Sequence, residues 1–360
     1  MASPTLSSPQ PQPLSLPSSV KELSDSITLP TIPQIFVSRN PEALRDFEPI
    51  VEEEIPTIDF DLLVNGAPDE RSQVVRELGK ACEDWGFFMV VNHGVPAKLR
   101  DSMMDAFKDL FGLTAEEKGE YLGRQVLDPI RIGTSFNSQV EDVMYWRDYV
   151  KIFVHPVFHS PNNPPKFREI SKEYTACTRV VGMELLKGIW NSLGLDDSQM
   201  GEALNLDSCF QILAGNLYPP CPQPELAMGL PSHSDHGLLT ILYQNGVNGL
   251  QVKHKGNWVH VKPLPDSYLV NTGDHMEIVS NGRYRSVLHR AVVSGESTRM
   301  SIVTLLGPNL DAVVEPSPHL VSIDRPLAYR GIKYGDFMEQ QQSSKLKDKS
   351  VLDLLRLHVN

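Results

Sequence analysis

No stretch of this sequence approaches the roughly 20 consecutive apolar residues that a membrane-spanning helix requires. The first lysine is Lys21, so both the charged start and the apolar stretch of a secretory signal are missing. Residues 1–19 lack acids, as plastid transit peptides do, but they also lack arginine and are dense in serine and proline, which favours a disordered arm. These absences predict a cytoplasmic protein that has no membrane partner.

Cysteine is scarce, and basic residues are fewer than acidic residues. The four cysteines, Cys82, Cys177, Cys209 and Cys221, are widely spaced and form no Cys-x-x-Cys pair that would indicate zinc or redox chemistry. Free thiols in a reducing compartment are expected. A net charge of -12 and a pI near 5.4 argue against a nucleic-acid partner. The sequence carries no signal for oligomerisation, so a monomer is the default expectation.

The apolar residues that are present, 41% of the 360, suffice for one large core or two modest ones. Apolar spacing predicts helices over 71–85, 97–111, 165–192, 334–342 and 351–357. It also predicts a short strand over 87–91, and strands separated by turn signals recur from 210 to 306. The expected fold class is mainly β with flanking helices, built on a double-stranded β-helix, or jelly roll.

Two histidines and an aspartate form the first candidate site. His233 and Asp235 are two residues apart, so in an extended segment both side chains leave the same face, just before the apolar run 238–242. His289 lies in the β-rich run 286–293 and shares a face with its apolar residues. Alone, His289 is more typical of a buried histidine satisfied by a hydrogen bond than of a metal ligand. Together, two imidazoles and a carboxylate are the facial triad that holds a non-haem iron(II) and leaves other coordination positions open.

Arg299 and Ser301 form the second candidate site. They share one face of a predicted strand with Val303 and Leu305. An arginine on a core-facing side needs a partner, because an unpaired buried guanidinium is very costly. A carboxylate fits the paired donors of its fork, and Ser301 would add a hydroxyl donor. The carboxylate belongs either to a ligand or to the protein, as part of a structural ion pair.

The order and spacing of these five residues closely resemble those of the metal and co-substrate motif in the plant-type 2-oxoglutarate- and Fe(II)-dependent dioxygenases of the isopenicillin N synthase-like superfamily. Other stretches typical of the family extend the resemblance over about residues 50–345: Trp85-Gly86-Phe87-Phe88, Val91-Asn92-His93-Gly94-Val95, Asn216-Leu217-Tyr218-Pro219, Gly249-Leu250-Gln251 and Asn271-x-Gly273-Asp274. One departure is Leu217, where a tyrosine is usual in the family. Another is Leu305, where some flavonoid-oxidising members have an aromatic residue, which weakens a specific flavonoid assignment.

The resemblance implies a role for each matching residue. His233, Asp235 and His289 would bind Fe(II), Arg299 and Ser301 would hold the distal carboxylate of 2-oxoglutarate, and Tyr218 and Asn216 would lie near this co-substrate. It further implies hydroxylation, desaturation or O-demethylation of a mid-sized hydrophobic plant metabolite, with O₂ and 2-oxoglutarate consumed, succinate released and ascorbate as a supporting reductant. Four residues are candidates to line the substrate pocket or simply to pack in the core: Phe136, Tyr145, Leu213 and Leu305.

The resemblance also divides the chain. Residues 1–50 would be a partly disordered arm, 51–205 the helix-rich N-terminal region of the dioxygenase, 206–310 the jelly-roll core with the Fe(II) and 2-oxoglutarate site, and 311–360 a C-terminal helical segment. Two alternatives stay open at this point. One is a related iron oxidase that takes its electrons from ascorbate or substrate, and the other is a non-catalytic ligand sensor on the same fold.

Overall fold

The computed structural model describes residues 19–26, 30–39, 53–122, 125–138, 140–196, 208–346 and 349–357. The expectation of a partly disordered arm over 1–50 lies mostly outside these ranges. Within the arm, the short helix α1 (Val20–Asp25) and the 3-10 turn η1 (Gln34–Phe36) are described, and both pack in an apolar cluster with Trp146. This part of the N-terminal segment is therefore docked against the main body.

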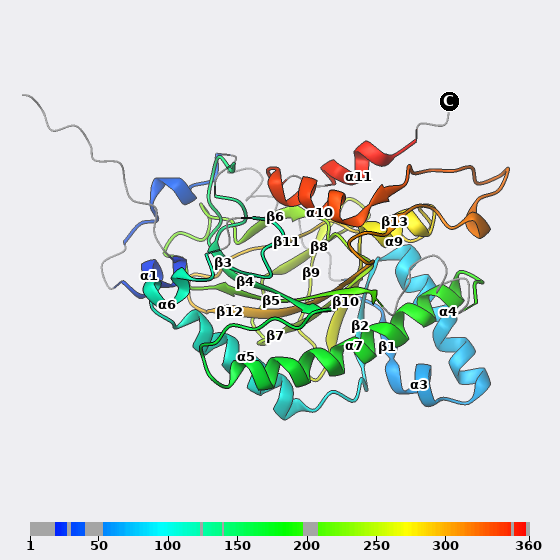
Figure 1. The fold of residues 1–360 in the computed structure, drawn as a ribbon, viewed down its shortest axis with the longest axis horizontal. Helices are drawn as coiled ribbons and strands as arrows, with labels where there is room; N and C mark the ends of the chain where they lie inside the picture. Colours follow the sequence, from blue (N-terminus) through cyan, green and yellow to red (C-terminus); the bar gives the residue numbers. More distant parts are fainter. Residues whose placement is uncertain are drawn as a thin grey trace, which may run out of the picture.

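Two β-sheets form the centre of the molecule (Figure 1). Among the described residues, the larger sheet has eight strands in the order β1-β2-β10-β7-β12-β5-β4-β3, and the smaller has four in the order β6-β11-β8-β9. The predicted mainly β fold with a jelly-roll core is confirmed. The strands are β1 Thr57–Asp59, β2 Phe87–Val91, β3 Ile130–Thr134, β4 Asp148–His155, β5 Phe210–Tyr218, β6 Leu230–His233, β7 Leu239–Gln244, β8 Leu250–His254, β9 Asn257–His260, β10 Tyr268–Thr272, β11 His289–Ala291, β12 Arg299–Gly307, and the pair β13 Val313–Val314 and β14 Ile332–Lys333.

Alternation along β12 separates the two faces of the larger sheet. Arg299, Ser301, Val303 and Leu305 line an internal cavity between the sheets. The intervening residues, Ile302 among them, pack in the main apolar core on the other face. Strand β5 is antiparallel to β12 in a continuous register from Arg299 opposite Tyr218 to Gly307 opposite Phe210. The period of two therefore gives each strand one apolar face for the helices and one mixed face for the cavity.

Helices cover the outer face of the larger sheet (Figure 1). The long α7 has buried residues at helical spacing along its sheet-facing side, and Gly182 allows it to approach β12, because an added Cβ would lie 2.3 Å from a Leu306 methyl. Helix α4 begins at Pro68, earlier than predicted, with the proline at a first-turn position where its missing N–H costs little. The helices are α3 Phe60–Asn65, α4 Pro68–Asp84, α5 Ala97–Phe111, α6 Ala115–Gly119, α7 Phe167–Ser192, α9 Asp274–Val279, η3 Pro318–Leu320, α10 Tyr334–Ser343 and α11 Ser350–Leu355.

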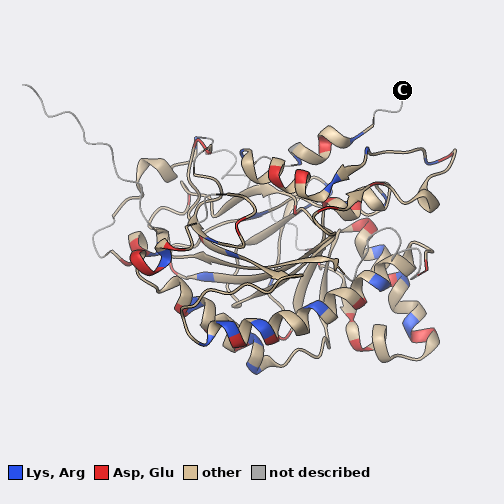
Figure 2. Ribbon diagram, in the orientation of Figure 1, with Lys and Arg blue, Asp and Glu red and all other residues tan. Residues whose placement is uncertain are grey.

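Charged residues of both signs lie along the solvent side of α4 and α7 (Figure 2). In the described part of the chain, none of the helices combines the length and apolarity needed to span a bilayer.

A buried carboxylate ties the C-terminal segment to α9. The side chain of Glu277 is 1% exposed and accepts hydrogen bonds from Lys349 Nζ at 2.7 Å, Arg356 Nη2 at 2.6 Å and the Tyr329 hydroxyl at 2.8 Å. Burial alone would raise the pKa of Glu277, but the charge and hydrogen bond of Lys349, together with Tyr329 and Arg356, lower it below the usual value. The ionised form is therefore the one that the folded chain stabilises.

Replacing Glu277 by glutamine is expected to destabilise the fold at pH 7 by about 3 kcal/mol, because two cations lose their buried counter-charge. Since the folded-state pKa is depressed, this contribution is present above the unfolded pKa of about 4.3 and is lost as the pH falls through the folded value. Urea unfolding at pH 7 and at pH 3.5–4 measures the difference, with exposed Glu296→Gln as the control. An equal loss at both pH values would contradict the role of charge.

Candidate functional site

Pairing of two short strands brings the predicted metal ligands together. His233 ends β6 and His289 begins β11, and these two residues are direct partners in the antiparallel register. Asp235 follows two residues later, in the connection to β7. Strand β6 ends at His233, shortly before Asp235. Pro231 lies within it, and β6 is an edge strand, where a missing N–H is tolerated.

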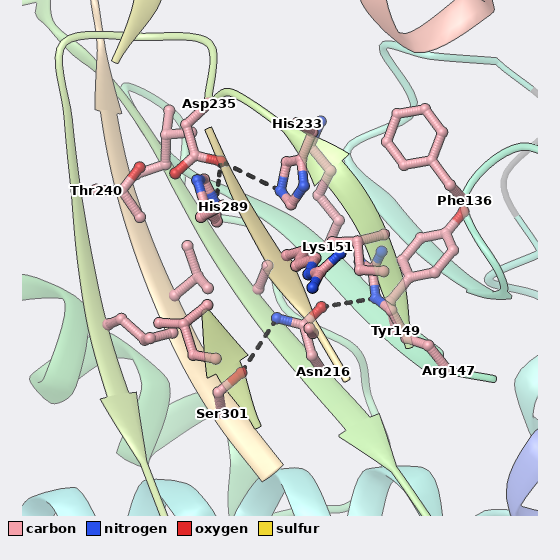
Figure 3. Close-up of a pocket in the computed structure, with 18 of the residues that line it drawn as sticks. Phe136, Arg147, Tyr149, Lys151, Asn216, His233, Asp235, Thr240, His289 and Ser301 are labelled. Atoms are coloured by element: carbon pink, nitrogen blue, oxygen red, sulfur yellow. Dashed lines mark hydrogen bonds and ion pairs between the residues drawn. The ribbon is translucent and has the colours of Figure 1, made fainter. Parts of the chain in front are cut away.

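The geometry of the three side chains fits a metal ion. Asp235 Oδ1 lies 3.8 Å from His233 Nε2 and 3.6 Å from His289 Nε2, and the three ligand atoms all lie within 4.8 Å of one another (Figure 3). Adjacent ligands of an octahedral ion, each about 2.1 Å from it, are about 3 Å apart. An ion would need to draw Asp235 Oδ1 and each histidine nitrogen together by less than about 1 Å.

Hydrogen bonds fix which ring nitrogens face the centre. Nδ1 of His233 lies 2.8 Å from the Pro231 carbonyl oxygen, and Nδ1 of His289 lies 3.2 Å from that of Val287. A carbonyl only accepts, so each Nδ1 carries the proton and each Nε2 presents a lone pair to Asp235. Three acceptor atoms therefore converge with no donor between them, and a cation satisfies all three.

Burial and hydrogen bonding set the charge of this centre. Burial, helped by the neighbouring His289, lowers the pKa of His233 to about 3, so its ring is neutral at physiological pH. Burial opposes ionisation of Asp235, but the two imidazoles and the Asn271 amide lower its pKa below the usual value. Asn271 Nδ2 donates to Asp235 Oδ2 at 3.0 Å, which orients the carboxylate and leaves Oδ1 for the metal. The triad thus presents one negative charge and two neutral ligands.

A buried cation lies in the same cavity. Arg299 is 3% exposed, and its Nη2 donates to Gln244 Oε1 at 3.1 Å, while Nε is buried without an acceptor. Its guanidinium carbon lies 5.2 Å from the centre of the Tyr218 ring. Burial lowers the pKa of Arg299, but an arginine stays protonated. No carboxylate in the described ranges pairs with it, so the protein-borne ion pair considered from the sequence is not seen.

Two further predicted residues lie next to Arg299. Tyr218 is its direct cross-strand partner, and Asn216 is the partner of Ser301. Asn216 Nδ2 donates to Ser301 Oγ at 3.4 Å, which leaves the serine hydroxyl hydrogen free to donate (Figure 3). Arg299, Tyr218 and Ser301 can therefore direct several donors at one anionic group in the cavity.

The cavity has a volume of about 180 Å³ and is lined by all seven residues predicted for metal and co-substrate, and by Phe136 and Leu305. Leu213 and Tyr145 do not line it. Leu213 is fully buried in the main core behind the sheet, because its neighbours Ile212 and Ala214 are the residues of β5 that face inward. Tyr145 is buried outside the cavity, with its hydroxyl donating to Glu141 at 2.8 Å.

Several lining residues were missed by the sequence reasoning. Three of them lie on or next to β4: Arg147 directly precedes the strand, and Tyr149 and Lys151 lie in its first half. Two more, Gln341 and Gln342, lie at the end of α10. The alternation of cationic and aromatic residues at 147, 149, 151 and 153 was the available signal, since it is unusual on a strand that borders a core.

Two family models match the chain. The model of the 2OG-Fe(II) oxygenase superfamily matches residues 207–308, and the model described as non-haem dioxygenase in morphine synthesis N-terminal matches residues 55–171. The first match contains every predicted metal and co-substrate residue.

Similar proteins cover most of the chain. The 2-oxoglutarate-dependent dioxygenase 19 of Oryza sativa subsp. japonica is 59% identical over 304 residues, which are 84% of this chain and 90% of that protein. Thebaine 6-O-demethylase of Papaver somniferum is 38% identical over 353 residues, 94% of this chain and 96% of that protein. The crystal structure of JOX2 in complex with 2OG, Fe and JA superposes with a TM-score of 0.84 at 30% identity, covering 94% of this chain and 98% of JOX2.

Proposed function

This chain belongs to the 2OG-Fe(II) oxygenase superfamily, and we propose that it oxidises a mid-sized hydrophobic plant metabolite in the cavity between its two sheets. It is a 2-oxoglutarate-dependent dioxygenase, an iron-dependent oxidoreductase. The observation that carries the proposal is a convergence within one cavity. Three acceptor atoms face a common point, and a buried arginine that pairs with no carboxylate of the described part of the chain lies on the neighbouring sheet.

Each of the predicted site residues has a proposed role in binding iron or 2-oxoglutarate. His233, Asp235 and His289 would hold Fe(II) by one atom each, and Arg299 and Ser301 would bind the distal carboxylate of 2-oxoglutarate. Bound iron(II) would supply open coordination positions and one-electron chemistry, through which decarboxylation of 2-oxoglutarate to succinate and carbon dioxide provides two electrons for O₂ reduction and the substrate provides the other two. The Asp235 charge leaves the centre cationic, which favours an α-keto acid.

The chain's own residues then orient the substrate and exclude water. Phe136, Leu305, Val303 and Leu242 give the cavity an apolar lining. Gln341 at the end of α10 donates to the Ser234 carbonyl oxygen at 3.3 Å and closes one side of the cavity. Holding a substrate C–H in a fixed position away from bulk water is the protein's main contribution in such a reaction. Hydroxylation, desaturation and O-demethylation are all outcomes of this arrangement.

Several finer assignments belong to the same proposal. Ascorbate would act as a supporting reductant, and residues 206–310 would form the catalytic core, preceded by the helix-rich region 51–205 and followed by the C-terminal segment. The four free cysteines support a reducing compartment, for which we propose the cytoplasm. We further propose that the protein is a monomer and that it binds neither nucleic acid nor a membrane.

Succinate release by the purified protein tests this function. The protein is given Fe(II), ascorbate, O₂ and 2-oxoglutarate and is challenged with pools of plant phenolics, alkaloids, terpenoids and hormones. We expect succinate to rise with a pool that contains a substrate, and formaldehyde to accompany it if the reaction is O-demethylation. Oxidised product formed without loss of 2-oxoglutarate would instead favour an iron oxidase that draws its electrons from ascorbate or substrate. Bound iron with no O₂-dependent turnover in any pool would favour a sensor.

A further inference from the structure

The wall of the cavity formed by β4 carries cations that nothing nearby balances. Side chains alternate along a strand, so Arg147, Tyr149, Lys151 and Phe153 share one face. The first three line the same cavity as the metal triad, and Figure 3 shows Arg147 and Tyr149 on the side where Phe136 lies. Arg131 of β3 is paired directly with Lys151 in the register of the sheet. Three cationic side chains therefore lie on neighbouring positions of one sheet face.

None of the three has a carboxylate partner in the part of the chain that the structure describes. The Lys151 ammonium makes no hydrogen bond there, and its contact is with the Phe153 ring, 5.9 Å from Nζ to the ring centre. Arg147 donates from Nε to Asn216 Oδ1 at 3.0 Å, but its Nη1 is buried without an acceptor. Arg131 Nε is also buried without an acceptor.

This concentration of positive charge is unfavourable unless an anion balances it. Burial, with the positive charges of Arg131 and Arg147, lowers the pKa of Lys151 to about 7. Among the described residues that line the cavity, the one carboxylate is Asp235, which already belongs to the metal triad. An anion bound at the β4 wall would satisfy the free donors and offset the repulsion between the cations.

Lys151, on the β4 wall of the cavity, is separate from the Arg299 site. Lys151 pairs with Ala214, which pairs with Val303, so Lys151 is two strands across and four residues along from Arg299. At about 4.8 Å per strand and 3.3 Å per residue, the two Cα atoms are about 16 Å apart. Arg299 is also held by Gln244 of β7, on the side of β12 away from β4. One five-carbon diacid that binds Arg299 and the metal therefore leaves Lys151 free, whereas Arg147 borders both sites through its hydrogen bond to Asn216.

We propose that Lys151 and Arg147 bind a carboxylate of the primary substrate, so that the enzyme acts on a ring-bearing organic acid. The assignment rests on the proposed function, because it takes this cavity as the place of substrate oxidation. Tyr149, whose ring lies 5.0 Å from the Arg147 guanidinium, and Phe136 provide aromatic surface beside the two cations. Anchoring at β4 would leave the apolar body of the substrate to extend along Val303 and Leu305 toward the metal.

Matched acid and amide probes test the charge preference without turnover. Binding of trans-cinnamate and cinnamamide, and of 1-naphthoate and 1-naphthamide, is measured by calorimetry on the full protein loaded anaerobically with Fe(II) and 2-oxoglutarate. We expect each acid to bind at least about tenfold more tightly than its amide, as charge-assisted hydrogen bonds exceed neutral ones by this amount.

Variants of Lys151 identify the group responsible. Lys151→Met should weaken acid binding about tenfold, to the level of the amide, and leave amide binding unchanged, whereas Lys151→Arg should retain the preference. Lys253→Met is the matched control, because Lys253 lies exposed on β8 with its ammonium near the Trp258 ring. Thermal unfolding verifies that each variant is folded, and 2-oxoglutarate affinity should stay within about twofold of the wild type.

Three results would overturn the proposal. The first is that the wild type binds acids and amides equally well, or binds neither. The second is an acid preference that survives Lys151→Met, and the third is a loss of 2-oxoglutarate binding in that variant. The last would place Lys151 in the co-substrate site. An acid preference in a protein that never forms succinate would leave the anion site standing and reject the proposed function.

Discussion

The Asp235→Ala variant is expected to lose iron and, with it, all measurable 2-oxoglutarate turnover. Asp235 supplies the one negative charge of the triad, and without it two neutral imidazoles face a divalent cation. Loss of a single outer-sphere partner of a metal ligand costs about 10–100-fold in affinity, so loss of a charged ligand should cost at least 100-fold. Iron content after gel filtration and succinate formation under O₂ measure the two effects.

Removal of Asp235 should not damage the fold. Its carboxylate is an acceptor beside two imidazole lone pairs, so the metal-free protein should tolerate alanine well. The control is Asp311→Ala, which removes an exposed carboxylate paired with Lys333, remote from the cavity. Iron retained in Asp235→Ala at the wild-type level, with the control also unchanged, would contradict the assignment of the triad.

The Arg299→Ala variant is expected to keep its iron and to require far more 2-oxoglutarate. The guanidinium is buried and has no carboxylate partner within the described ranges, so its binding energy is available to the co-substrate. A charge-assisted hydrogen bond contributes about 1.5–3 kcal/mol, which corresponds to a rise in the apparent KM for 2-oxoglutarate of about 10–150-fold. Steady-state succinate formation at varied 2-oxoglutarate concentration measures this rise, with iron content determined on the same samples.

Two further variants sharpen the interpretation. Arg299→Lys keeps the charge but loses the planar fork, so its apparent KM should lie between those of the wild type and Arg299→Ala. Arg325→Ala removes an exposed arginine and should behave like the wild type. An unchanged apparent KM in Arg299→Ala would mean that 2-oxoglutarate binds elsewhere.

The grouping of the candidate metal and co-substrate residues around one cavity was predictable from the sequence because most of them lie where a local rule applies. The two-residue spacing of His233 and Asp235 and the alternation along 299–305 fix side-chain direction before any tertiary contact is known. The pairing of His289 with His233, in contrast, depends on strands 56 residues apart meeting in one register, which spacing alone does not determine. Resemblance to a known family supplied that link.

The substrate pocket was predicted less well for a physical reason. Residues 212–215 of β5 are all apolar or small, so they carry no local signal of their own, and only the alternation from Asn216 and Tyr218 places Leu213 on the opposite face. Hydrogen bonding of Tyr145 to Glu141 depends on the fold of an irregular segment. Lys151 was overlooked because a lysine is usually an exposed residue, and its burial follows from the cross-strand neighbours Arg131 and Ala214.

If the triad and Arg299 form one oxygen-activating site, substrate oxidation must consume 2-oxoglutarate, and the fate of 2-oxoglutarate reveals whether it does. Iron-loaded protein is mixed with 2-oxoglutarate and an active substrate pool, with O₂ and without it, and succinate, carbon dioxide and residual 2-oxoglutarate are quantified. We predict equimolar succinate and carbon dioxide in the presence of O₂, none in its absence, and none with Asp235→Ala. Oxidation of the substrate while 2-oxoglutarate remains intact would contradict the account.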